Sequence, residues 1–118
     1  MVSYLDDALG MIIAEMRQAQ LYDSALVVLS SDNGGAGYVG LAEINAPYRG
    51  WKLTLYEGGL RVPLFLRWPG TIPAGTTVDA PVAHIDVMPT LAKLTGAGAS
   101  HGLGNKPFDG RDVLDVLQ

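Results

Sequence analysis

The chain has 118 residues and a mass of 12.5 kDa, the size of one ordinary globular domain. Its apolar fraction of 48% is that of a globular protein and argues against a disordered chain. A formal net charge of −4 provides no broad basic face, so we expect no nucleic-acid partner. Because there is no cysteine, disulfides, thiolate metal sites and cysteine nucleophiles are excluded within these residues.

We expect neither a membrane span nor a signal peptide in this chain. The longest apolar run, 25–29, is far shorter than the roughly 18 residues that a spanning helix needs. The opening residues contain two acids, Asp6 and Asp7, where a signal peptide would carry positive charge. The sequence therefore indicates no membrane partner and leaves the compartment undefined.

The spacing of apolar residues predicts an amphipathic helix over 3–20. Ser3 is the expected N-cap, with Asp6 three positions later in an arrangement like a capping box. Apolar side chains recur at the interval of one helical face, so we expect a buried stripe made of Leu5, Leu9, Ile12, Ile13 and Met16.

Two strands and a second helix are expected further along the chain. The aliphatic run 25–29 predicts a strand buried on both faces, as in the parallel sheet of an α/β protein. The segment 62–68 predicts a second strand. A helix over 86–94 is expected, with Asp86 as its N-cap and Gly96 just past its end.

The clearest chemical signal is Asp32-Asn33-Gly34, directly after the first expected strand. In open α/β sheets, ligands bind at this carboxyl end of the strands. A carboxylate and a carboxamide oxygen side by side are hard ligands that suit Ca²⁺ or Mg²⁺. The same residue types are also common in simple turns, so a turn without a ligand is the alternative interpretation.

A second charged stretch, 49–63, contains Lys52. Its ammonium group is a point charge that suits a sulfate or phosphate oxygen. Taken alone, the stretch is better explained as a solvated loop with ordinary Arg–Glu pairs.

Six short blocks along nearly the whole chain resemble, in order and spacing, the sulfatase family of the alkaline-phosphatase superfamily. They are SDNGG at 31–35, RGWK at 49–52, YEGGLRVP at 56–63, WPG at 68–70, HIDVMPTL at 84–91 and DGRD at 109–112. The resemblance implies an α/β fold: a partial alkaline-phosphatase/sulfatase-like sheet with flanking helices, rich in loops. Residues 1–118 would then form a single partial sulfatase-like domain.

The resemblance also implies roles for individual residues. Asp32 and Asn33 match two ligands of the family's divalent cation, usually Ca²⁺, with Mg²⁺ or Zn²⁺ as alternatives. Lys52 matches the lysine that contacts the sulfate group of the substrate, so we expect it to contact the oxyanion of a small anionic ester. Glu57 and Arg61 match a loop that we interpret as structural, pinning that lysine in place.

The apolar strand expected at 25–29 lacks neighbours, which leads us to expect a homo-oligomer, and the predicted cation ligands are also too few for one chain. Asp32 and Asn33 supply about two or three of the roughly six to eight oxygens that Ca²⁺ takes. Two copies meeting at the strand ends would complete a site, as would His84 or His101 for a transition metal. We interpret the block containing His84 and Asp86 mainly as a fold element. A C₂ dimer is favoured, since the strand at 25–29 otherwise lacks neighbours.

Members of the family carry their nucleophile on a Cys/Ser-x-Pro-x-Arg motif, in which the Cys or Ser is converted to formylglycine. The 118 residues contain no such motif. The resemblance therefore implies a fragment that keeps part of the cation- and sulfate-binding corner without formylglycine and has no native sulfatase turnover. Two alternatives stay open. One is a small standalone, promiscuous metal-dependent hydrolase of activated sulfate, phosphate or carboxyl esters, and the other is a binding or assembly module of a split enzyme.

Overall fold

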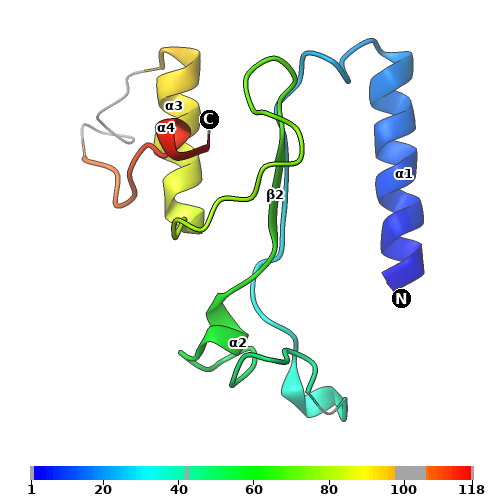
Figure 1. Cartoon of the computed structure of the whole chain (residues 1–118), viewed down its shortest axis with the longest axis vertical. Helices are drawn as coiled ribbons and strands as arrows, with labels where there is room; N and C mark the ends of the chain where they lie inside the picture. Colours follow the sequence, from blue (N-terminus) through cyan, green and yellow to red (C-terminus); the bar gives the residue numbers. More distant parts are fainter. Residues whose placement is uncertain (1, 42, 98–105, 118) are drawn as a thin grey trace. The chain divides into compact units, whose positions relative to one another are not determined.

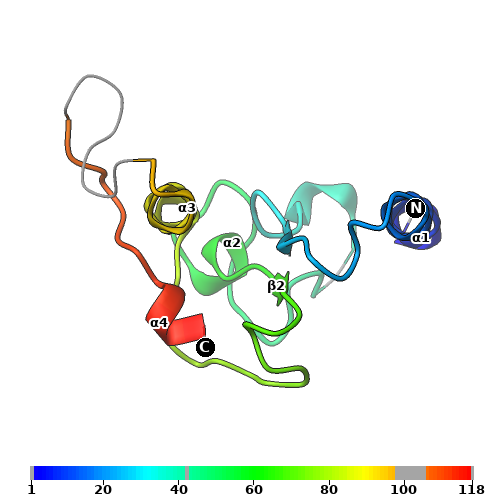
Figure 2. The same ribbon diagram turned by 90° about the horizontal axis from the view of Figure 1, so that it is seen from above.

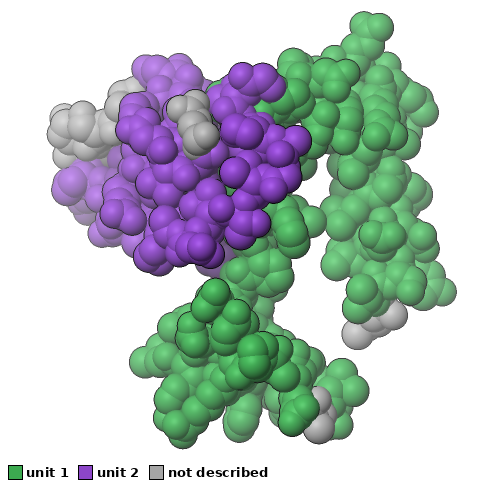
Figure 3. All heavy atoms as spheres, in the orientation of Figure 1, with its two compact units in different colours: residues 1–69 green, residues 70–118 purple. Residues whose placement is uncertain are grey.

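The computed structural model describes residues 2–41, 43–97 and 106–117 (Figure 1). The chain divides into two compact units, Met1–Pro69 and Gly70–Gln118, which Figure 3 colours separately. The first unit contains α1 (Val2–Gln18), β1 (Val27–Ser30), the 3₁₀ helix η1 (Gly37–Val39), α2 (Glu57–Leu60) and β2 (Leu64–Arg67). The second contains the 3₁₀ helix η2 (His84–Asp86), α3 (Val87–Thr95) and α4 (Leu114–Leu117). Within these described ranges, no helix combines the length and apolar character needed to cross a membrane.

Helix α1, seen end-on in Figure 2, confirms the expected helix but not its expected environment. Ser3 lies inside the helix rather than at its N-cap, because the helix already includes Val2. None of its residues is buried, and Leu5 and Ile12 of the predicted stripe are exposed. The prediction of a buried stripe was therefore wrong. An amphipathic pattern specifies which face needs cover, but the cover has to come from a neighbouring layer.

Strands β1 and β2 form a two-stranded antiparallel sheet, in which Val27 is paired with Arg67 and Ser30 with Leu64. The two predicted strands are thus confirmed, each within shorter bounds. The parallel arrangement, with the first strand buried on both faces, was wrong: Val28 and Leu29 are 40% and 38% exposed. Two paired strands satisfy backbone hydrogen bonds along one edge each but cover neither face. Helices together with a small sheet are what a partial α/β domain would contain.

Arg67, at the end of β2, joins the strand pair to the turn that follows α1. Its guanidinium donates to the carbonyl oxygen of Tyr22 and lies 3.4 Å from a carboxylate oxygen of Asp23. The guanidinium also lies 3.5 Å from the centroid of the Tyr22 ring, in a cation–π contact. These contacts join the end of β2 to the segment that leads into β1.

Helix α3 spans nearly the expected residues and ends as predicted. Gly96 adopts a left-handed conformation (φ 68°) and donates its N–H to the carbonyl oxygens of Ala92 and Lys93. Asp86 precedes the helix, but its side chain forms no capping hydrogen bond to it. The expected N-cap role was therefore wrong, because this carboxylate has other partners, described below.

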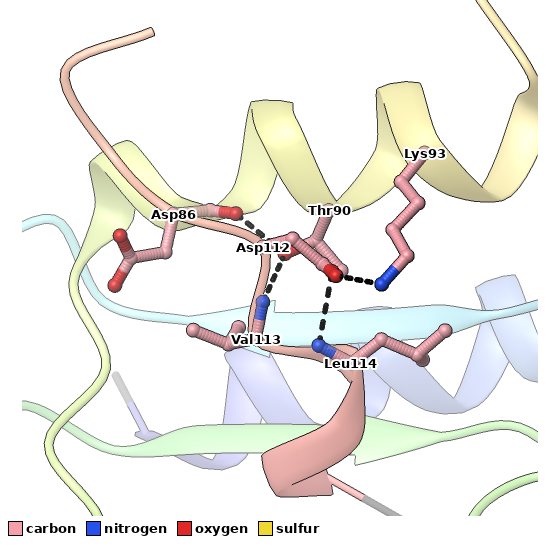
Figure 4. Close-up of polar contacts among 6 residues, drawn as sticks. All are labelled: Asp86, Thr90, Lys93, Asp112, Val113 and Leu114. Carbon is pink, nitrogen blue, oxygen red and sulfur yellow. Dashed lines mark hydrogen bonds and ion pairs between the residues drawn. The ribbon is translucent and has the colours of Figure 1, made fainter. Parts of the chain in front are cut away.

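The hydroxyl of Thr90 holds the segment after residue 109 against α3 (Figure 4). This hydroxyl donates to the Asp86 carbonyl oxygen at 2.7 Å and accepts the N–H of Val113 at 3.1 Å. Thr90 and Val113 are both buried, so the two bonds are shielded from water. The result is a direct link between α3 and the start of α4.

An ion pair strengthens the same link one turn further along α3. Lys93 pairs with one oxygen of Asp112, while the other oxygen of Asp112 accepts the N–H of Leu114 at 3.1 Å (Figure 4). The Lys93 ammonium lowers the pKa of Asp112, and Asp112 in turn raises the pKa of Lys93. One carboxylate oxygen of Asp112 thus forms the ion pair, and the other accepts a hydrogen bond from the first turn of α4.

Candidate functional site

Three stretches of the first unit meet between the end of β1 and the start of β2, and we call them the loop cluster: residues 31–35, 45–52 and 54–61. Hydrogen bonds between main-chain atoms hold them together. They run from Gly34 N–H to the Gly59 carbonyl (3.0 Å), from Lys52 N–H to the Gly35 carbonyl (3.1 Å) and from Gly58 N–H to the Arg49 carbonyl (2.8 Å). The segment that follows Asp32-Asn33 therefore lies directly against the segment that carries Lys52.

Glycines in the SDNGG and YEGG blocks make this close backbone contact possible. A Cβ atom on Gly34 would lie only 1.8 Å from the carbonyl oxygen of Gly58. A Cβ on Gly58 would lie 2.3 Å from the carbonyl oxygen of Gly50. No side chain fits at either position without moving the backbone, so the glycines are explained by packing of main chain on main chain.

The side chain of Asn45, which no motif in the sequence singles out, forms three hydrogen bonds in the loop cluster. Its Oδ1 accepts the N–H of Gly35 at 2.7 Å, and its Nδ2 donates to the carbonyl oxygens of Gly35 and Gly50, both at 3.0 Å. The only feature of the sequence that could have indicated this role is an asparagine between two glycine-rich blocks. The signal is weak, because asparagine is common in turns of every kind.

Asp32 and Asn33 lie just past β1 with oxygen atoms available for a cation. The Asp32 side chain is exposed, and among the described residues no hydrogen bond or ion pair engages its carboxylate. Asn33 donates through Nδ2 to the carbonyl oxygen of Gly34 at 2.9 Å, which leaves its Oδ1 out of that bond. These donors fit a hard divalent cation but do not complete its shell. Across 2–41, 43–97 and 106–117, no cluster of three or more His, Asp or Glu side chains could hold a metal.

The side chain of Lys52 is half-buried in a region rich in cations and aromatic rings. Arg49 lies 4.1 Å from the ring centroid of Tyr56, and Arg61 lies 4.8 Å from that of Tyr48. Both arginines therefore have ring partners, whereas Lys52 carries a more compact ammonium group, which is a point charge.

Glu57 and Arg61, which we expected to pin the lysine, form an ion pair with each other at 3.2 Å across one turn of α2. Their side chains are 64% and 60% exposed, so water screens the attraction. The main-chain N–H of Lys52 donates to the carbonyl oxygen of Gly35, and the N–H of Gly58, next to Glu57, donates to the carbonyl oxygen of Arg49.

Asp86 belongs to the second unit and uses its carboxylate within the fold, which confirms the interpretation of its block as a fold element. The residue is 6% exposed, and its two oxygens accept the N–H groups of Arg111 and Ala83, each at 2.9 Å. These two bonds, first that from Arg111 and then that from Ala83, lower the pKa of Asp86. His84 lies in η2 with an exposed side chain, and His101 falls outside the described residues.

Comparisons with known proteins agree with the motifs. The family model for sulfatases matches residues 1–97. Steryl-sulfatase of Rattus norvegicus is 37% identical over 122 aligned positions, which cover 98% of this chain and 21% of the rat protein. The human steryl-sulfatase is 35% identical over 99% of the chain and 21% of its own length. A sulfatase of Formosa agariphila is 32% identical over 99% of the chain and 22% of its own length.

The chain belongs to the sulfatase family, a family of hydrolases that bind a divalent cation. It spans about a fifth of the length of the curated relatives it matches. Within that fifth, the loop cluster is the region where the family's SDNGG and RGWK blocks contact each other through their main chains.

Proposed function

We propose that this chain forms the cation- and sulfate-binding corner of a sulfatase-family hydrolase. In this proposal Asp32 and Asn33 bind a divalent cation, with Ca²⁺ favoured over Mg²⁺ and Zn²⁺. Lys52 binds the oxyanion of a small sulfate ester. The observation that carries the proposal is the hydrogen bond from Lys52 N–H to the Gly35 carbonyl, at 3.1 Å. It holds the lysine segment against the segment that carries the two cation ligands.

Charge explains why the two binding roles belong together. A cation at Asp32 and Asn33 would offset their negative potential and attract a sulfate oxygen to the same place. Lys52 would then contribute a second positive charge to the same anion. A bound cation acts as a Lewis acid that withdraws electron density from the ester oxygen.

The proposal assigns binding to these residues, not the attack on sulfur. Covalent sulfate transfer needs a nucleophile, and the 118 residues contain neither a cysteine nor a Ser-x-Pro-x-Arg motif. We therefore expect no native sulfatase turnover from these residues alone. Turnover without an attacking side chain would require a metal-bound water, which is the alternative of a small promiscuous hydrolase.

Self-association is part of the proposal, because one copy supplies too few cation ligands. Exposed apolar side chains support it, including Leu5, Met11 and Ile12 on α1 and Phe65 on β2. Exposed apolar patches of this kind favour association, and a C₂ dimer is the commonest outcome. Sedimentation of the 118-residue chain should show a dimer at micromolar concentration, whereas a single monomeric species would contradict this part.

Titration calorimetry with CaCl₂ tests the cation site. The wild type should bind Ca²⁺, and Asp32→Ala should reduce the affinity by about tenfold or more, since one carboxylate ligand is lost. Asp79→Ala is the matched control, because Asp79 is also exposed but lies in the second unit. Failure of the wild type to bind Ca²⁺, Mg²⁺ or Zn²⁺ would contradict the cation site.

Titration with inorganic sulfate in the presence of Ca²⁺ tests the anion site. Lys52→Ala should weaken sulfate binding, while Lys106→Ala, at an exposed position, should leave it unchanged.

An activity panel of aryl sulfate and of phosphate mono-, di- and triesters, run with and without a chelator, separates binding from turnover. Chelator-sensitive hydrolysis that disappears in Asp32→Ala would favour the small hydrolase over the binding corner.

A further inference from the structure

We infer that Asn45 is a positioning residue that couples the cation-binding turn to the sulfate-binding lysine, an inference that rests on the function proposed above. Asn45 is half-buried in the loop cluster, and its carboxamide makes three hydrogen bonds. Two of them go to the N–H and the carbonyl oxygen of Gly35, and the third goes to the carbonyl oxygen of Gly50.

These contacts place Asn45 between the backbone that follows Asn33 and the backbone that precedes Lys52. Gly35 lies two residues after the cation ligand Asn33, and Gly50 lies two residues before Lys52. The carbonyl oxygen of Gly35 accepts both the Asn45 Nδ2 and the N–H of Lys52, at 3.0 and 3.1 Å. One side chain therefore connects the backbone on the cation side with the backbone on the lysine side. A shift of either segment would break at least one of its bonds.

The chemistry of this bridge requires a carboxamide. It needs one acceptor and two donors in a single plane, which aspartate, serine and threonine do not provide. The backbone of Asn45 is itself held in a turn, because the N–H of Tyr48 donates to the main-chain carbonyl oxygen of Asn45 at 2.8 Å. The fit is close on the other side as well: a Cβ on Gly35 would lie 2.9 Å from Asn45 Oδ1. A glutamine would keep the donor and acceptor atoms but displace them by one methylene.

A purely structural role for Asn45 makes a different prediction from a positioning role. If Asn45 only stabilised the fold, its loss and the loss of Lys52 would weaken sulfate binding independently, and the two effects would multiply. If Asn45 acts through Lys52, the lysine of an Asn45→Ala variant is already misplaced. Removing that lysine would then cost little more.

A double-mutant cycle on sulfate affinity distinguishes the two roles. The wild type, Asn45→Ala, Lys52→Ala and the double variant are titrated with inorganic sulfate at saturating CaCl₂. We expect Lys52→Ala to weaken binding about tenfold in the wild type but less than about twofold in the Asn45→Ala background. Lys106→Ala serves as the matched control and should have no effect in either background.

Amide hydrogen exchange supplies a second readout that needs no ligand. In Asn45→Ala the amides of Gly35 and Lys52 should exchange faster, while those of the β1–β2 pair keep their wild-type protection and so report an intact fold. Asn45→Gln should lie between the wild type and Asn45→Ala in both experiments. If the β1–β2 amides also lose protection in Asn45→Ala, the cycle is carried out with Asn45→Gln.

The possible failures are distinct. Sulfate binding that survives with multiplicative effects would overturn the coupling and leave the proposed function standing. Unchanged exchange at Lys52 in Asn45→Ala would also overturn the inference. A wild type that binds no sulfate would overturn the proposed function, and the coupling with it.

Discussion

Asp32 and Asp86 have the same side chain but are used in opposite ways in the two units of this protein. Asp32 is exposed at the end of β1, and within the described ranges its carboxylate engages no hydrogen-bond or ion-pair partner. Asp86 is buried, and both of its oxygens accept main-chain N–H groups. A carboxylate whose oxygens are already occupied by its own chain stabilises the fold, whereas one left exposed beside a turn is available to a ligand.

The same contrast applies to the two regions around them. In the loop cluster, hydrogen bonds of the main chain and of the Asn45 side chain hold the three stretches together, and Asp32 and Lys52 form no part of this network through their side chains. In the second unit, Thr90 and Asp86 are themselves the connections between α3 and the segment after it. Changes to polar side chains should therefore affect mainly binding in the loop cluster and mainly stability in the second unit, whereas a change to the backbone contacts of the loop cluster should also affect stability.

The largest loss of stability should come from the backbone contact in the loop cluster. Gly34→Ala would place a Cβ 1.8 Å from the Gly58 carbonyl oxygen, so the two segments must separate. We expect a loss of about 2–4 kcal/mol in the free energy of unfolding, measured by urea titration. Gly10→Ala is the control: nothing lies within 4 Å of its Cβ, and the helix α1 should gain about 0.5–1 kcal/mol. Equal effects at both positions would contradict the close contact.

A smaller but pH-dependent loss is expected at Asp86. Asp86→Asn replaces one acceptor oxygen by a donor that faces an N–H group, and should cost about 1–3 kcal/mol at neutral pH. Asp79→Asn, at an exposed position of the same unit, should change stability by less than about 0.5 kcal/mol.

The pH dependence of this difference has a defined sign. The pKa of Asp86 lies below its ordinary value of 3.8 in the folded state, so the folded state retains the ionised form longer than the unfolded state does. Its contribution is therefore complete above pH 3.8 and is lost as the pH falls through the lowered pKa. Urea titrations at decreasing pH should show the wild type approaching Asp86→Asn. A difference that stays constant down to the acid transition would mean that the two N–H bonds do not depend on the charge.

The smallest effect is expected at the exposed ion pair of α2. Glu57→Gln should cost less than about 0.5 kcal/mol, because both partners are mostly in water. Arg61→Ala should cost somewhat more, since it also removes the contact with the Tyr48 ring at 4.8 Å. Sulfate affinity and the amide exchange of Lys52 should stay at wild-type values in Glu57→Gln. A loss of sulfate affinity as large as that of Asn45→Ala would instead show that the Glu57–Arg61 ion pair positions Lys52.

Local patterns in the sequence were sufficient for the two longer helices, the two strands and the family, but not for the short helices α2 and α4. The apolar period of 2–18, the aliphatic run before Ser30 and the stop at Gly96 each depend on near neighbours, and each element formed close to its expected bounds. The motif blocks were recognisable as strings, and the match of the family model over 1–97 confirmed the family that they indicated. The two expected N-caps were wrong for different reasons: Ser3 lies inside α1, and the carboxylate of Asp86 accepts the N–H groups of Ala83 and of the distant Arg111.

The sequence by itself therefore determined the two longer helices, the two strands and the family, and it predicted which side chains suit a cation and an oxyanion. Only the tertiary structure decided that Asn45 connects Gly35 to Gly50, that the expected sheet is an exposed antiparallel pair, and that the Asp86 carboxylate accepts the N–H groups of Ala83 and Arg111. The physical reason is range. Helix periodicity and turn chemistry act within a few residues, whereas a buried polar group is satisfied by whichever N–H the folded chain brings to it.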